Sequence, residues 1–120
     1  MSAYLKWAQS LLLSVAPALT ACTDSPPPLG SHLPGVFKEA SNAFDQRVKE
    51  RFAIGTHEGT LRRELARERF VVARDPKSPF SFTATYIANE LVCRADWHIR
   101  WSEFAGRIAT IDADYGEICL

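Results

Sequence analysis

Apolar and polar side chains alternate from Leu91 to Ser102, and this pattern allows few local structures. The apolar set is Leu91, Cys93, Ala95, Trp97, Ile99 and Trp101, and the polar set between them is Arg94, Asp96, His98, Arg100 and Ser102. Apolar positions at a period of two indicate an antiparallel strand with one face buried and the other in water. The fold must therefore cover one face of this strand with a core.

Neighbouring segments predict further strands of the same sheet. A short strand is expected near residues 70–72 and a loop at 74–79, and the next alternating set is Phe80, Phe82, Ala84 and Tyr86. Residues 103–107, EFAGR, predict a three-residue hairpin loop with Gly106 at positive φ. The strand that follows would bury one face, formed by Ala109, Ile111, Ala113 and Tyr115.

Two helices are expected before the strands. Residues 36–52 carry an apolar stripe at helical spacing, made of Phe37, Ala40, Phe44, Val48 and Phe52. Gly55 is expected to end this helix. Residues 56–69 predict a second helix with Thr56 as N-cap, Glu58 in its first turn and a charged, solvated outer face. The predicted class is α+β, with two N-terminal helices packed on a three- to four-stranded antiparallel meander, preceded by a signal peptide and a Pro-rich tether.

Residues 1–21 predict a lipoprotein signal peptide. Its apolar run, residues 7–19, is too short for a transmembrane helix of about 20 residues. The end of the run, LTAC at residues 19–22, resembles a bacterial lipobox, which implies that Cys22 becomes the lipid-modified first residue of the mature protein. We therefore expect a bacterial envelope lipoprotein held in the membrane by acyl chains. The periplasmic face of the outer membrane is favoured because Thr23, and not Asp, follows the cysteine.

Residues 22–35 predict an extended tether. The stretch CTDSPPPLGSHLPG contains four prolines and two glycines and has no hydrophobic period. Consecutive prolines favour polyproline geometry, so at about 3 Å per residue this spacer would hold a domain roughly 20–40 Å from the bilayer. The remaining residues, 36–120, are expected to form a single domain.

If Cys22 carries the lipid, Cys93 and Cys119 are the two cysteines left to form a disulfide. Oxidising envelope compartments preserve disulfides, so a bridge is expected. The alternatives are two free buried thiols, or a zinc site completed by His98.

The predicted hairpin makes the bridge depend on register. If Glu103 faces Arg107, Cys93 faces Glu117, and Cys119 lies one diagonal step away. Diagonal Cβ atoms are about 7 Å apart, whereas a disulfide needs about 4 Å. A bridge therefore requires a bulge, or a bend of the last strand.

Charge and motif content exclude several functional classes. The chain has 14 basic and 14 acidic residues and a formal net charge of zero, so nucleic acid is not an expected partner. The sequence contains no nucleophile-elbow, phosphate-loop or HExxH pattern. Asp112 and Asp114 share a strand face and could do acid/base work or bind calcium, but solvation and edge protection are the expected roles. We predict no catalytic residue, metal, cofactor or small-molecule substrate.

The polar face of the 91–102 strand is the candidate contact surface for a partner protein. Its residues are Arg94, Asp96, His98 and Arg100. Trp97 and Trp101 could form an aromatic binding surface, since such residues anchor interfaces. They share their face with Leu91 and Ile99, however, and are expected in the core beneath the helices.

Two motifs carry a resemblance to a known family. RFAIGTHEGTLRREL, residues 51–65, resembles the Phe-x-x-Gly-Thr turn and second helix of the SmpA/OmlA-type lipoproteins of outer-membrane protein assembly, and DWHIRW, residues 96–101, is similar to their central strand. The β-lactamase-inhibitor-protein-like fold is related to that family. The resemblance implies a non-enzymatic envelope lipoprotein that acts as a structural or protein-binding module in outer-membrane assembly or integrity. The alternative that it implies is a periplasmic inhibitor or immunity protein against an envelope hydrolase.

Overall fold

The structure, a computed structural model, describes residues 24–120. The predicted signal peptide, residues 1–21, and the predicted lipidation site, Cys22, lie outside the described residues. Among the helices of residues 24–120, none has the length and apolar character needed to cross a membrane.

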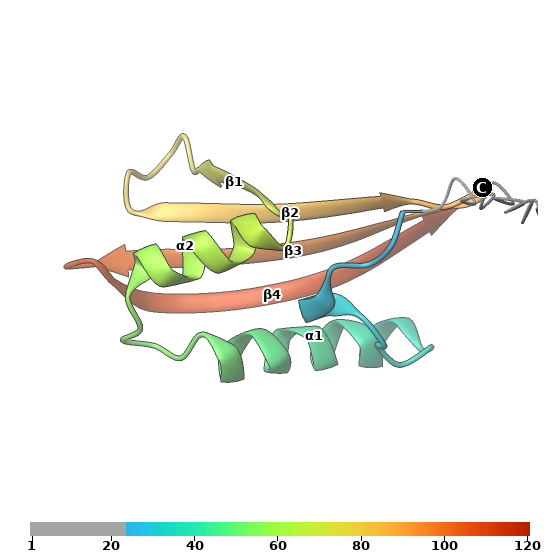
Figure 1. Cartoon of the computed structure of the whole chain (residues 1–120), viewed down its shortest axis with the longest axis horizontal. Coiled ribbons are helices and arrows are strands. Elements are labelled where there is room, and N and C mark those ends of the chain that lie inside the picture. The colour runs from blue at the N-terminus through green and yellow to red at the C-terminus, as the bar shows by residue number, and fades with distance from the viewer. Residues whose placement is uncertain (1–23) are drawn as a thin grey trace, which may run out of the picture.

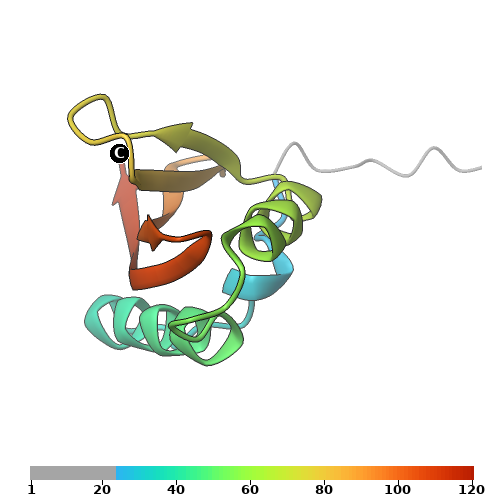
Figure 2. The ribbon, with the colours of Figure 1, turned by 90° about the vertical axis from the view of Figure 1, so that its left-hand side faces the viewer.

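Within these residues, two α-helices and a four-stranded antiparallel sheet confirm the α+β class. The elements are a 3₁₀ turn η1 (Pro28–Gly30), α1 (Phe37–Arg51), α2 (Glu58–Arg67), β1 (Val71–Arg74), β2 (Ser81–Asn89), β3 (Cys93–Phe104) and β4 (Arg107–Cys119). The strands are neighbours in chain order, β1-β2-β3-β4, which makes the sheet a meander. Figures 1 and 2 show a curved sheet with both helices on one side, α1 running along β4.

The helix-covered face of β3 forms the core, as its alternation predicts. Four inward side chains in the middle of β3 are at most 4% exposed, and the helices supply the opposing layer: Ala95, Trp97, Ile99 and Trp101 pack with Phe44, Val48, Phe52, Leu61 and Leu65. Trp97 and Trp101 are therefore core residues. The prediction for Leu91 is wrong, because this residue precedes the strand and is 87% exposed in the β2–β3 turn.

The helix α2 begins without the predicted side-chain cap. His57, and not Thr56, occupies the N-cap position, and its side chain makes no capping hydrogen bond. The backbone N–H of Glu58 instead donates to Gly106 O of the β3–β4 hairpin at 3.0 Å. The hairpin thus satisfies a donor that a cap would otherwise serve. Gly55 has the positive φ that was expected, 91°, but α1 already ends at Arg51 with Phe52 as its C-cap, so the prediction that Gly55 ends this helix is wrong.

The loop of the β3–β4 hairpin is shorter than predicted. Phe104 pairs with Arg107, which leaves Ala105 and Gly106 as a two-residue loop with φ of 51° and 77°. Two successive positive φ angles define a type I′ turn, whose twist matches that of the strands it joins. The expected pairing of Glu103 with Arg107 is therefore wrong.

A bulge beside this turn shifts the register of the hairpin. Ser102 pairs with Thr110 but Glu103 pairs with Ile108, so Ala109 is the extra residue. Ile108 is 1% exposed and takes the core position that was predicted for Ala109. Beyond the bulge, each β3 residue pairs with a β4 residue two positions further along the chain than predicted. Because a shift of two residues preserves alternation, the other β4 residues lie on the sheet face that was predicted for them.

The Pro-rich segment packs on the domain over residues 27–31, which corrects the prediction of a free tether from 22 to 35. Pro27 and Leu29 are buried, and Leu29 belongs to the core cluster. The Trp97 indole N–H donates to Gly30 O at 3.1 Å. A buried indole needs an acceptor, and the turn at Gly30 supplies one while Leu29 closes one side of the core.

Charged side chains from both helices hold this turn. Arg47 of α1 donates through Nη1 to Leu29 O at 3.0 Å and to Ser31 O at 2.7 Å. The Leu29 N–H donates to Glu68 Oε1, just beyond α2, at 2.6 Å. These contacts satisfy backbone groups that a proline-containing segment cannot pair within a regular helix or strand.

Replacement of Gly30 by alanine is expected to destabilise the protein by about 1–3 kcal/mol, because a Cβ there would overlap the Trp97 indole ring. The matched control is Gly35→Ala, since an added Cβ at Gly35 meets no atom of the described chain within 4 Å. Urea denaturation of both variants is the measurement. Equal midpoints for the two variants would show that the segment does not pack on Trp97.

Candidate interaction surface

The predicted contact residues lie together on the sheet face that points away from the helices. Arg94, Asp96, His98 and Arg100 alternate along β3 with the buried core row. The paired residues of neighbouring strands extend this open face, and they are Thr83, Thr85, Ile87, Asn89, Asp112, Asp114, Gly116 and Ile118. The open face, defined by these twelve residues, is mainly polar.

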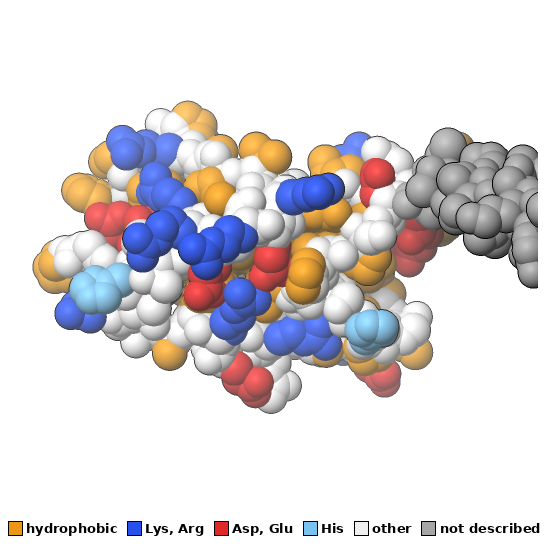
Figure 3. All heavy atoms as spheres, viewed as in Figure 1, with side chains coloured by type: hydrophobic (Ala, Val, Ile, Leu, Met, Phe, Trp, Pro, Cys, Tyr) orange, Lys and Arg blue, Asp and Glu red, His pale blue; other side chains and the backbone are white. Residues whose placement is uncertain are grey.

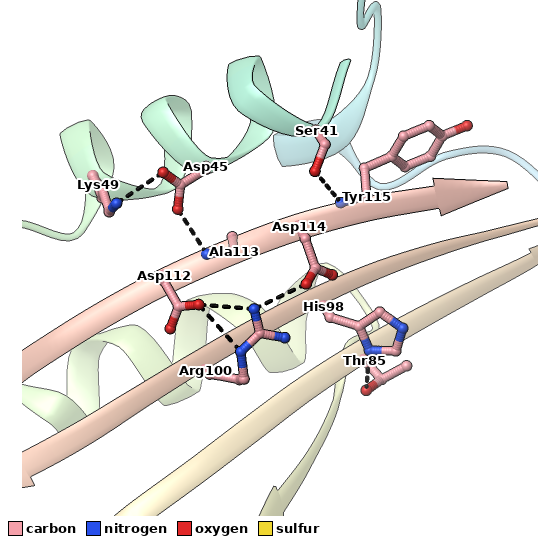
Figure 4. A network of polar contacts seen from close by, with 10 residues as sticks. All are labelled: Ser41, Asp45, Lys49, Thr85, His98, Arg100, Asp112, Ala113, Asp114 and Tyr115. Carbon is pink, nitrogen blue, oxygen red and sulfur yellow. Dashed lines mark hydrogen bonds and ion pairs between the residues drawn. The ribbon is translucent and has the colours of Figure 1, made fainter. Parts of the chain in front are cut away.

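Arg100 organises the centre of the open face (Figure 4). Its Nε and Nη2 donate to Asp112 Oδ2 at 3.2 and 2.7 Å, and Nη2 also donates to Asp114 Oδ2 at 2.9 Å. The hydrogen bond to Asp112 raises the pKa of Arg100 above its ordinary value, with Asp114 adding to it against the opposing effect of burial. Both carboxylates are thus oriented by a guanidinium, an arrangement that presents a fixed pattern of charge.

The other polar residues of the row also have partners. Arg94 Nε donates to Asp96 Oδ1 at 3.1 Å, and His98 Nδ1 lies 3.3 Å from Thr85 Oγ1 (Figure 4). Exposed pairs of this kind add little to stability, typically 0 to about 1 kcal/mol. Their effect is to order side chains of both charge signs across one surface.

The free edge of β4 is covered by α1 and not by the aspartates expected to protect it. Asp45 Oδ1 accepts from the Ala113 N–H at 2.8 Å, and Ser41 Oγ accepts from the Tyr115 N–H at 3.2 Å (Figure 4). Neither Ser41 nor Asp45 was predicted to contact the sheet. The available signal was that Ser41 and Asp45 lie four residues apart, which puts two acceptors on one side of the helix.

The helix side of the molecule carries many basic side chains (Figure 3). Acidic residues lie among them, as predicted for a solvated face. Arg51 binds Glu64 and Glu68 at 3.1 and 2.6 Å, and Arg62 binds Glu58 at 2.6 Å. Ion pairs within the chain therefore partly neutralise the positive charge on this side.

Glu58 has a structural role that the sequence did not reveal. The residue is 7% exposed, and besides pairing with Arg62 its Oε1 accepts from the Trp101 indole N–H at 3.2 Å. The carboxylate therefore joins α2 to the core row of β3.

A cavity of about 290 Å³ lies where the Pro-rich segment meets α1 and the sheet, lined among others by His32, Phe37, Trp97, Tyr115 and Glu117. The Tyr115 hydroxyl donates to Glu117 Oε2 at 3.4 Å. Burial, with a further contribution from Glu117, raises the pKa of Tyr115 above its ordinary value. The sequence did not predict this cavity because one wall is the segment expected to be a spacer.

The raised pKa of Tyr115 predicts a loss of stability at alkaline pH. Below about pH 10 the phenol is protonated in both the folded and unfolded states, and above it the unfolded state releases the proton first. Stability should therefore fall as pH rises toward the higher folded pKa. The variant Tyr115→Phe should lose less stability than the wild type over this range in urea titrations. Equal pH dependence of the two proteins would contradict the assignment.

Cys93 and Cys119 form a disulfide at the end of the β3–β4 pair. The bulge makes these residues direct partners, where the predicted register had placed Glu117 opposite Cys93. His98 lies on the open face, whereas Cys93 shares the parity of the core row, so the alternative zinc set of these three residues does not come together.

Comparison with known proteins identifies no family for this chain. No family model, no curated protein and no solved structure matches it. The similarity of residues 51–65 and 96–101 to the SmpA/OmlA-type lipoproteins therefore stays a prediction from sequence, and functional argument rests on the geometry of the described residues.

Proposed function

We propose that this protein is a non-enzymatic envelope lipoprotein that binds another envelope protein through the open face of its sheet, in outer-membrane assembly or integrity. The observation that carries the proposal is the contrast between the two faces. One face is buried under α1 and α2, while the described chain leaves the other uncovered. The charged residues of this uncovered face are held by one pair within β3 and by two contacts between β3 and β4.

The chemistry of the open face suits a folded protein partner. Positive and negative groups alternate over a short distance, a pattern that favours partners of complementary charge and disfavours others. Ile87 adds exposed apolar surface, at 44% exposure. Because Arg100, Asp112 and Asp114 are already ordered, less side-chain entropy is lost when a partner binds.

The proposed location rests on the lipobox at residues 19–22 and on the apolar run before it. Several acyl chains on Cys22 give stable anchoring, because each buried CH₂ contributes about 0.8 kcal/mol. An anchored binding module needs no reaction centre, in keeping with the absence of a catalytic motif in the sequence.

Site-specific photocrosslinking in cells tests the proposal. A photoreactive residue at Thr83, on the open face, should capture one defined envelope protein, whereas the same residue at the exposed Arg63 of α2 should not. The substitution Arg100→Glu should abolish the Thr83 product, while the control Arg63→Glu should leave it unchanged. Capture that is equal at both positions, or insensitive to Arg100→Glu, would reject the open face as the binding surface.

The captured protein also separates the two functional classes. An outer-membrane assembly component supports the proposed role. A stoichiometric complex with a soluble hydrolase or toxin would instead favour the inhibitor or immunity protein.

A further inference from the structure

We propose that one end of the sheet rests directly on the lipid bilayer. The membrane-facing tip is defined as Leu91, Val92, Ile118 and Leu120, contributed by the β2–β3 turn and the end of β4. This inference rests on the proposed lipid anchor at Cys22. It adds a second, non-covalent contact with the membrane and an orientation of the domain.

The tip exposes an unusual amount of apolar surface. Leu91 is 87% exposed, Val92 61% and Ile118 66%, and Leu120 is also fully exposed. These residues lie together, because the Leu120 N–H donates to Val92 O at 2.8 Å and the adjoining Cys93–Cys119 bond joins the two strands. Clustered exposed apolar residues mark interaction sites in soluble domains.

The start of the described chain, at Asp24, lies beside this tip. The Asp24 N–H donates to Asn89 O at 3.3 Å, and the Asn89 N–H donates to Asp24 Oδ2 at 3.1 Å. Asn89 ends β2, two residues before Leu91. Figure 1 shows the start of the described chain, the β2–β3 turn and the end of β4 at the same end of the molecule.

Covalent geometry then limits how far the tip can stand from the lipid. Cys22 precedes Asp24 by two residues, and a chain spans at most about 3.6 Å per residue. Two residues of chain therefore allow the proposed anchor a separation of at most roughly 7 Å from Asp24. A stand-off of 20–40 Å, as the sequence predicted for a free tether, would require Asp24 and the following segment to leave the domain.

The chemistry of the tip favours contact with the lipid region where acyl chains meet headgroups. Glu90 and Glu117 flank the apolar residues, with Arg94 as the nearby base. This mixed charge gives no strong attraction to anionic headgroups, so apolar burial is the interaction that we assign. The apolar face of an interfacial amphipathic helix is buried about 5–10 Å in this region, and we expect a similar depth for the tip.

The test uses the mature lipidated protein, which begins at Cys22, in vesicles of phosphatidylethanolamine and phosphatidylglycerol, with and without a phosphatidylcholine brominated on its acyl chain. Bromine quenches tryptophan only at short range. The probe is Leu91→Trp, and the control is Phe104→Trp, because Phe104 is 78% exposed beside the hairpin turn at the opposite end of β3. Trp97 and Trp101 are buried and serve as a background common to all samples.

Brominated lipid should quench Leu91→Trp more than the wild type and shift its emission to shorter wavelength, while Phe104→Trp should match the wild type. If the protein co-floats with the vesicles but the two variants are quenched equally, the tip does not touch the bilayer, and only the lipid anchor is supported. If intact mass shows no acyl chains and the protein does not co-float, both the lipid anchor and the proposed orientation are rejected.

Discussion

Replacing Trp97 with alanine is expected to lower the free energy of unfolding by about 3–5 kcal/mol, because the variant loses apolar burial and leaves a cavity. Trp97 is 4% exposed, and its ring centroid lies 5.6 and 5.1 Å from those of Tyr86 and Tyr115. Its indole N–H also binds Gly30 O, so the change would release the Pro-rich segment from the core. Urea denaturation followed by far-UV circular dichroism measures the loss.

The control for Trp97→Ala is Phe104→Ala, which removes an aromatic ring from the same strand. Phe104 is 78% exposed, so its loss should change stability by no more than about 0.5 kcal/mol. A similar small effect of both substitutions would mean that β3 does not bury the face assigned to the core.

Loss of the Cys93–Cys119 bridge is the second large effect. The double variant Cys93→Ser/Cys119→Ser should be less stable by about 3 kcal/mol, because the bond closes a loop of 26 residues in the unfolded chain. Denaturation with and without reductant measures it. Reduced wild type should match the double variant, and the double variant should not respond to reductant.

Alkylation in denaturant provides an independent check of the bridge. Without reductant, Cys93 and Cys119 should stay unmodified, and both should react after reduction. Modification of both in the unreduced protein would show free thiols and would rule out the bridge.

Local patterns predicted the main elements because they follow from periodicity. The stripe of residues 36–52 and the alternation along β3 repeat often enough to indicate both the type of element and its buried face, except at Phe37, which is 57% exposed at the start of α1. The hairpin register could not be obtained in this way. It depends on the bulge at Ala109, which reflects the fit between β4 and its neighbours and leaves no composition signal.

The Pro-rich segment shows how composition can mislead. Prolines and glycines around Leu29 are typical of a spacer, yet Leu29 enters the core and Gly30 supplies the acceptor for Trp97. A usable signal lay elsewhere in the chain, since a tryptophan on the buried face of a strand requires an acceptor for its N–H.

The sequence predicted which β3 residues form the candidate surface, but it did not predict their contacts with β4. The alternating pattern predicted that the polar residues between Arg94 and Arg100 lie on the solvent-facing side of β3, and the structure confirms this. The contacts of Arg100 with Asp112 and Asp114 depend on which β4 residues lie opposite, and the bulge sets that pairing. The contacts on this surface could therefore not be predicted without knowing the register between β3 and β4.

Metabolic labelling with palmitate, combined with cell fractionation, tests the envelope-lipoprotein proposal. The wild type should incorporate label and sediment with outer membranes, and intact mass should place the acyl chains on Cys22 as the first residue. The variant Cys22→Ser should take up no label and leave the membrane fraction. An unlabelled wild type, with Cys22→Ser in the same fraction as the wild type, would contradict the lipid anchor and the envelope function built on it.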